Sequence, residues 1–207
     1  MRSLILFLGI LLAGTMARAD RGISLPTAKQ AVELVNTQLN VIARNQVVVV
    51  EGSDSNTDLR PRKWDITFFE AGEMNGGILV RVKDGAFVSK STSVRMFDDA
   101  RWNRFTRNFS GYEDTEVIKP ARWLVDSDAA IKSALAHPKL AGLQVTAVRL
   151  TLRKPSDGDV PPVWRVKLRA RSPQTPRRDR WVGHLEFNAE NGQLLADELR
   201  VEQLTHE

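Results

Sequence analysis

The stretch Lys63-Trp64-Asp65-Ile66-Thr67-Phe68 alternates polar and apolar side chains with a period of two. Such alternation is typical of a β-strand that buries one face, and it places Trp64, Ile66 and Phe68 together on the buried side. Val163-Trp164-Arg165-Val166-Lys167-Leu168 repeats the pattern later in the chain. We therefore predict two equivalent strands, each of which directs a tryptophan side chain into the protein core.

Each tryptophan strand is followed by a second alternating strand that ends in a glycine turn. Asp84-Gly85 ends the first copy and Asn191-Gly192 ends the second. Asp-Gly and Asn-Gly are strong hairpin signals, because a type I′ turn needs positive φ at both central residues. A further apolar segment follows each turn, at 86–88 and at 193–195.

One helix is predicted upstream of each tryptophan strand. Thr27 to Gln30 matches a capping box, and apolar residues continue at helical spacing as far as Leu39. Asp126 or Ser127 caps the second helix, and Pro138 ends it because proline has no N–H to donate. A β-branched strand follows each helix, at 46–51 and at 144–153.

The order helix, strand, strand, hairpin, strand therefore occurs twice, which indicates an internal duplication. We predict an α+β fold made of two repeated modules, each a helix packed on an antiparallel β-sheet. The predicted divisions are a signal peptide at 1–19, a first module at 20–97, a connector with a short amphipathic helix at 98–121, and a second module at 122–207.

A helix, a W-x-[IV]-x-[FL] strand and an alternating strand that runs into an acidic-Gly or Asn-Gly turn together resemble the PepSY domain, a family named for the propeptides of thermolysin-type proteases. The second half matches better, through Ala129-Ala130-Ile131, Trp164–Leu168 and Leu185–Leu195. The first half departs at Lys83-Asp84-Gly85, where the acidic lead to the glycine is shortened.

Tandem copies also look like the helix-on-sheet architecture of β-lactamase-inhibitor-type proteins. The resemblance implies a non-enzymatic module that binds or restrains a protein partner, often a peptidase.

The first residues have the pattern of a cleavable secretory signal peptide. Arg2 precedes an apolar run from Leu4 to Ala13, and Ala17-Arg18-Ala19 supplies small residues before a cleavage site. The run has about half the length that a bilayer span needs. We expect cleavage before Asp20 and a periplasmic or secreted location, with no membrane span.

The composition narrows the classes of function. The net charge is +5, and cleavage would lower it to +3 by removing two arginines. This is far less basic than a nucleic-acid-binding domain, so we expect no nucleic-acid partner. The chain has no cysteine, so its stability must come from packed cores rather than disulfides.

No catalytic, metal-binding or cofactor-binding motif is recognisable. His137, His184 and His206 belong to no hydrolase or metalloprotease signature. Asp98-Asp99 is typical of a helix cap, and the loop from Gly52 to Arg60 lacks the order of a calcium-binding loop. We therefore predict a protein that is not an enzyme and uses no cofactor.

Two segments are candidate binding surfaces. In the connector, an aromatic stripe at helical spacing either packs against the modules or docks a partner; it consists of Trp102, Phe105 and Phe109. In the second half, basic residues alternate along the tryptophan strand and continue into the next loop, where they form either a solvated face or an anion-binding stripe. They are Arg165, Lys167, Arg169, Arg171, Arg177, Arg178 and Arg180.

These observations predict an exported, non-enzymatic protein that binds an unidentified protein partner, as a peptidase inhibitor or a folding modulator. The alternative is an envelope-associated protein that binds a polyanion through the basic face of the second half.

Overall fold

The computed structural model describes residues 25–55, 57–69, 76–95, 115–155, 158–174 and 177–204. The predicted signal peptide, and most of the connector with Trp102, Phe105 and Phe109, lie outside these residues. The signal peptide and the domain boundaries therefore stay predictions.

Two α-helices, three short 3₁₀ helices and nine strands occur in the part of the chain that the structure describes. In chain order they are α1 (Ala28–Asn36), β1 (Val47–Ser55), β2 (Pro61–Phe69), β3 (Gly76–Lys83), β4 (Ala86–Arg95), β5 (Thr115–Glu116), η1 (Pro120–Arg122), α3 (Ser127–Leu135), η2 (Pro138–Leu140), β6 (Gln144–Pro155), β7 (Val163–Arg171), β8 (Arg180–Asn188), β9 (Leu194–Asp197) and η3 (Val201–Leu204).

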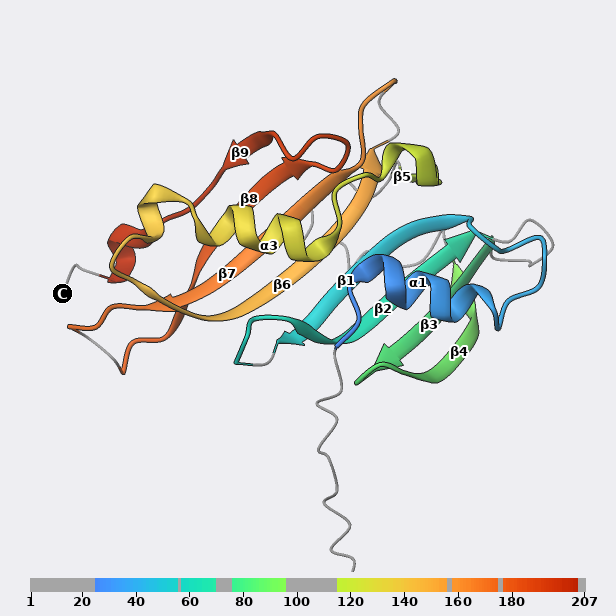
Figure 1. The fold of residues 1–207 in the computed structure, drawn as a ribbon, viewed down its shortest axis with the longest axis horizontal. Helices are drawn as coiled ribbons and strands as arrows, with labels where there is room; N and C mark the ends of the chain where they lie inside the picture. Colours follow the sequence, from blue (N-terminus) through green and yellow to red (C-terminus); the bar gives the residue numbers. More distant parts are fainter. Residues whose placement is uncertain are drawn as a thin grey trace, which may run out of the picture.

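The strands form one antiparallel sheet in the order β4-β3-β2-β1-β6-β7-β8-β9, and the short β5 pairs with β6. The strand orders of the two halves mirror each other about the β1–β6 pair (Figure 1). In that pair Val50 lies opposite Leu152, and Glu51 lies opposite Thr151. The predicted fold of two separate helix-on-sheet modules is therefore wrong, because a ladder of hydrogen bonds joins the halves into a single sheet.

The run Val47–Val50 explains why β1 is central rather than at an edge. All four valines are buried, because Val47 and Val50 belong to the main core while Val48 and Val49 pack with Phe69 and Val117 in a second cluster. A one-sided strand would alternate instead. The strand ends later than the predicted 46–51, because its pairing with β2 continues to Ser55.

Both helices cover the same face of the sheet (Figure 1). Trp64 and Trp164 are fully buried beneath them. Each indole N–H donates to a carbonyl just before a helix: Trp64 to Pro26 at 3.1 Å and Trp164 to Val125 at 2.8 Å. The prediction of a tryptophan in the core of each repeated strand is confirmed.

One apolar row crosses the sheet under the helices. Its members lie directly opposite one another on successive strands and are all buried; they are Phe187, Trp164, Leu152, Val50, Ile66 and Val80. These side chains belong to one hydrophobic cluster that also includes the buried faces of α1 and α3. The two halves thus share a core as well as a sheet.

The helix starts follow the predicted caps. Thr27 and Gln30 form the capping box of α1, and Asp126 is the N-cap of α3. The two helix starts also contact each other, which the sequence pattern did not indicate. The Ala28 N–H donates to the Ser127 hydroxyl at 3.0 Å, and the Lys29 N–H donates to the Asp126 carboxylate at 3.2 Å.

The two glycine turns differ. Asp84 and Gly85 have φ of 51° and 78°, so the first is the predicted type I′ hairpin. In the second only Gly192, with φ of 78°, has positive φ among the central pair. Its backbone N–H donates to the Asn188 carbonyl at 2.8 Å, which closes a longer loop between β8 and β9. The prediction of a type I′ hairpin turn is therefore wrong at Asn191-Gly192.

The chain lacks cysteine, so it forms no disulfide. Within the described ranges, none of the helices combines the length and the apolar character that crossing a membrane requires.

Candidate partner-binding face

The sheet face opposite α1 and α3 carries most of the charged strand residues, and we call it the polar face. Successive side chains of a strand point to opposite faces. The neighbours of the buried apolar row therefore lie on the polar face. The positions on β7 are Arg165, Lys167, Arg169 and Arg171, which were the predicted anion-binding residues.

A row of polar residues crosses the centre of this face. Its members lie opposite one another on six neighbouring strands; they are Glu186, Arg165, Thr151, Glu51, Asp65 and Arg81. Hydrogen-bonded ion pairs form at both ends of the row. Arg165 approaches Glu186 at 2.7 Å, and Arg81 approaches Asp65 at 2.7 Å. These pairs hold charges of both signs in place on a rigid sheet.

Glu51 lies at the middle of the row, where the sheets of the two halves join. Burial and, to a smaller extent, the facing carboxylate of Asp65 raise its pKa to about 7, against the opposing effects of Lys63 and Arg149. Asp65 itself is paired with Lys63 and Arg81, each at 2.7 Å. Asp65 thus engages the Arg81 and Lys63 cations.

A second, basic row runs beside the first. On β6 and β7, Arg149 lies directly opposite Lys167, and on β8 His184 lies opposite Lys167. The pKa of His184 is lowered by burial and by the nearby Arg165 cation, so this imidazole is mostly neutral near pH 7 and adds little charge. On the other side, Lys63 and Lys83 face each other on β2 and β3.

Trp181 is the aromatic residue of the basic row. The Arg149 guanidinium carbon lies 5.0 Å from the centre of its ring, and the Lys167 Nζ lies 5.3 Å away. Both distances fit cation–π contacts. Trp181 also lies opposite Arg169, another polar-face residue.

A β-bulge in β8 places Trp181 on this face. Leu168 pairs with Gly183 and Arg169 pairs with Trp181, so Val182 is the extra residue. Gly183 has φ of 116°, and a Cβ there would lie 2.0 Å from the Glu198 carbonyl oxygen. Strict alternation from Leu185 would direct Trp181 into the core. The bulge instead buries Val182 and directs Trp181 to the cations.

The predicted basic stripe is largely paired within the protein. Besides Arg165 with Glu186, Arg169 approaches Asp179 at 3.3 Å and Arg171 donates to the Gln144 amide oxygen at 2.8 Å. Of the four β7 residues, Lys167 alone has no carboxylate or amide partner among the described residues. Arg177, Arg178 and Arg180 lie at the start of β8 and in the loop before it.

Sequence reasoning missed Arg149, Trp181 and Glu51. Arg149 and Glu51 occupy polar positions of their strands, but their neighbours are set by the β6 pairings, which are not local in sequence. Trp181 lies two residues before Gly183, and a glycine within a strand is the local signal of a bulge.

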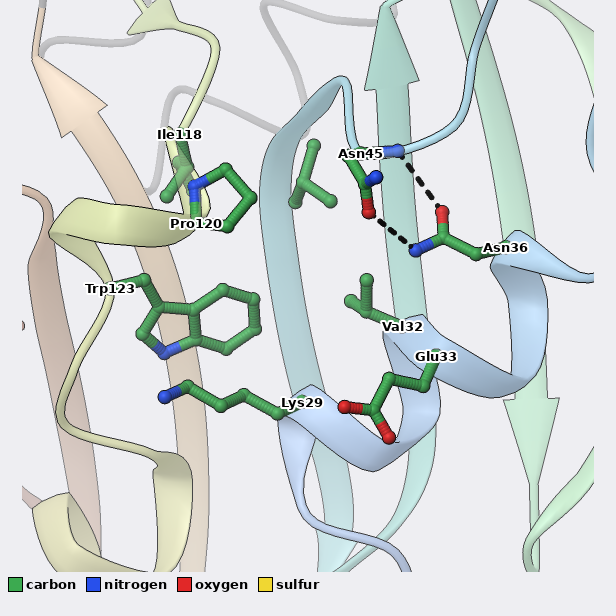
Figure 2. Close-up of a pocket in the computed structure, with 9 residues that line it drawn as sticks. Lys29, Val32, Glu33, Asn36, Asn45, Ile118, Pro120 and Trp123 are labelled. Atoms are coloured by element: carbon green, nitrogen blue, oxygen red, sulfur yellow. Dashed lines mark hydrogen bonds between the residues drawn. The ribbon is translucent and has the colours of Figure 1, made fainter. Parts of the chain in front are cut away.

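A separate cleft lies on the helix side, between α1 and the segment around η1 (Figure 2). Its volume is about 210 Å³ and its floor is apolar, with Val32, Ile118 and Trp123. Lys29 extends across its mouth, where the ammonium lies 5.8 Å from the Trp123 ring and donates to the Leu124 carbonyl at 3.1 Å. The space suits a single side chain rather than a cofactor.

No group of three or more histidine, aspartate or glutamate side chains in the described ranges is arranged to hold a metal ion. No family model, curated protein or solved structure matches the chain.

Proposed function

We propose that this is an exported, non-enzymatic protein that binds a protein partner on its polar face, as a peptidase inhibitor or a folding modulator. The observation that supports it best is the row of fixed charges from Glu186 to Arg81. Charges held by cross-strand ion pairs on a sheet need little reordering when a partner docks. Such surfaces contribute specificity through complementary charge.

The mixture of signs favours a protein partner over a polyanion. A polyanionic chain that followed the basic stripe along β7 would meet Glu186, which lies directly opposite Arg165 on β8. Arg165 and Arg169 are also already engaged by carboxylates. A folded protein surface can match both signs at fixed positions, whereas a uniform polyanion cannot.

The test is capture of a partner by the purified chain from the exported fraction of the source cells, identified by mass spectrometry. The polar-face variant combines Lys83→Glu with Lys167→Glu, which lie on the two halves. The control combines Lys119→Glu with Lys132→Glu, which are exposed away from this face. Both variants change the net charge equally, so nonspecific electrostatic effects cancel.

A partner that the wild type and the control retain, and the polar-face variant loses, supports the proposal. Equal capture by both variants contradicts it. If the partner is a peptidase, a proteolysis assay with added wild-type chain decides between inhibition and unrelated binding.

The polyanion alternative is tested with the same proteins on a heparin column. Replacing Arg165, Arg169 and Arg171 with glutamine should abolish retention if the stripe binds polyanions, and retention should fall steeply with salt. Retention that is unchanged in this triple variant would reject the alternative.

A further inference from the structure

Arg149 and Lys167 form a pair of like charges that face each other on adjacent strands. Like charges directly opposite in a sheet repel each other. Neither cation has a carboxylate within ion-pair distance in the part of the chain that the structure describes, whereas the neighbouring Arg165 and Arg169 each have one. Among the described residues, the pair is thus a positive centre of the polar face that no direct ion pair neutralises.

Trp181 is directed to this centre by the β8 bulge. Both cations lie over its ring, at 5.0 and 5.3 Å. A tryptophan would contribute more to stability in the core, and Val182 occupies the buried position instead. Trp181 is half-buried at this position, and tryptophan and arginine are the residue types that most often dominate binding energy in protein interfaces.

We propose that Arg149, Lys167 and Trp181 form an anion-recognition centre that takes an aspartate or glutamate side chain of the protein partner. This inference rests on the proposed function and names the chemistry of the partner at that site. A carboxylate placed between the two cations relieves their repulsion and gains charge-assisted hydrogen bonds. The stem of the same side chain lies against the indole.

Carboxylates around the centre limit what fits there. His184 lies between Glu186 at 4.0 Å and Glu198 at 3.8 Å, one strand away from Lys167. A single acidic side chain, or a short acidic loop, fits between these groups. A continuous polyanion would be repelled on leaving the centre.

The test uses as its probe a short peptide with a single glutamate between glycine and serine residues, blocked at both ends and carrying a neutral fluorescent label. Fluorescence polarisation is the readout. The double variant Arg149→Gln with Lys167→Gln removes both charges and keeps polar side chains of similar length. The matched control is Lys119→Gln with Lys132→Gln. A second readout is the Trp181 indole N–H signal in NMR spectra, assigned by its loss in Trp181→Phe.

We expect the peptide to shift the Trp181 signal and the double variant to raise its dissociation constant at least tenfold, while the control changes it less than twofold. Equal affinity in the double variant and the control overturns the inference. Binding of a heparin oligosaccharide at the Trp181 signal, without binding of the single-glutamate peptide, also overturns it.

The proposed function is tested by a separate measurement, the capture of a partner from the exported fraction. It fails if the polar-face variant captures the same partners as the wild type, and this measurement does not involve the peptide.

Discussion

Glu51 is the residue at which the two halves meet on the polar face, and its pKa of about 7 exceeds the ordinary value of 4.5. When the pKa of a carboxyl is higher in the folded protein than in the unfolded chain, its contribution to folding stability is greatest at pH values below the pKa in the unfolded chain. This contribution is lost as the pH rises from 4.5 to about 7, because the carboxyl then ionises in the unfolded chain while it stays protonated in the folded protein.

Glu51→Gln should therefore stabilise the protein at pH 8 by about 1–3 kcal/mol and change stability little at pH 4.5, since one pKa unit corresponds to about 1.4 kcal/mol. Urea unfolding of both proteins between pH 4.5 and 8 measures the difference. The control is Glu33→Gln, which removes a carboxylate exposed on α1. A difference that does not grow with pH would contradict the assignment.

Gly52 of β1 lies opposite Trp64 of β2, and its lack of a side chain leaves room for the indole ring. A Cβ at Gly52 would lie 2.6 Å from the Trp64 ring and 2.9 Å from the Pro61 ring. Because the core around Trp64 is closed, Gly52→Ala should destabilise the protein by about 1–3 kcal/mol. Chemical denaturation measures this, and Ser53→Ala, which faces the other side, should change stability by less than about 0.5 kcal/mol.

The start of α3 caps two helices at once. The Asp126 carboxylate accepts from the Ser127 N–H at 2.7 Å and from the Lys29 N–H of α1 at 3.2 Å. Asp126→Ala should cost about 1–2 kcal/mol, at the upper end of the range for a single cap. Asp128→Ala, in the exposed first turn of α3, is the control. Equal losses in the two variants would show that the shared cap contributes nothing.

Local elements could be predicted because their signals are local. The Thr27–Gln30 capping box, the Asp84-Gly85 turn and the two tryptophan strands each depend on a few consecutive residues. The second glycine turn could not be predicted from Asn191-Gly192 alone, because a loop closed by Asn188 replaces the two-residue turn. Trp181 was missed for a similar reason, since one bulge reverses the alternation that assigns side chains to a face.

The pairing of β1 with β6 belongs to the whole molecule and follows from no short motif. The repeat was recognised correctly as an order of elements, yet order does not determine whether two repeats form two sheets or one. The apolar run from Val47 to Val50 was the available signal, since it departs from the alternation of a strand with one solvated face. Without the β1–β6 pairing, the sequence could not predict which charged residues lie opposite one another on the polar face.

A shared sheet and core predict cooperative unfolding. Calorimetry should show one transition whose van 't Hoff and calorimetric enthalpies agree, as two-state unfolding requires. Two resolved transitions would indicate that the halves are stable separately and would contradict the shared core described above.

Strands β1 and β6 join the halves into one sheet, and a designed disulfide between them tests this pairing. The chain has no cysteine, so Glu51→Cys with Thr151→Cys introduces a single pair at positions that lie directly opposite. Opposed residues in antiparallel strands have Cα atoms about 4.5–5.5 Å apart, which a disulfide can bridge. The control pair, Glu51→Cys with Arg149→Cys, is diagonal and too distant.

We predict that mild oxidation of the folded protein removes both thiols of the opposed pair, as measured by thiol titration, and leaves both thiols of the diagonal pair. Free thiols in the folded opposed pair, or equal crosslinking of the two pairs, would contradict the single sheet.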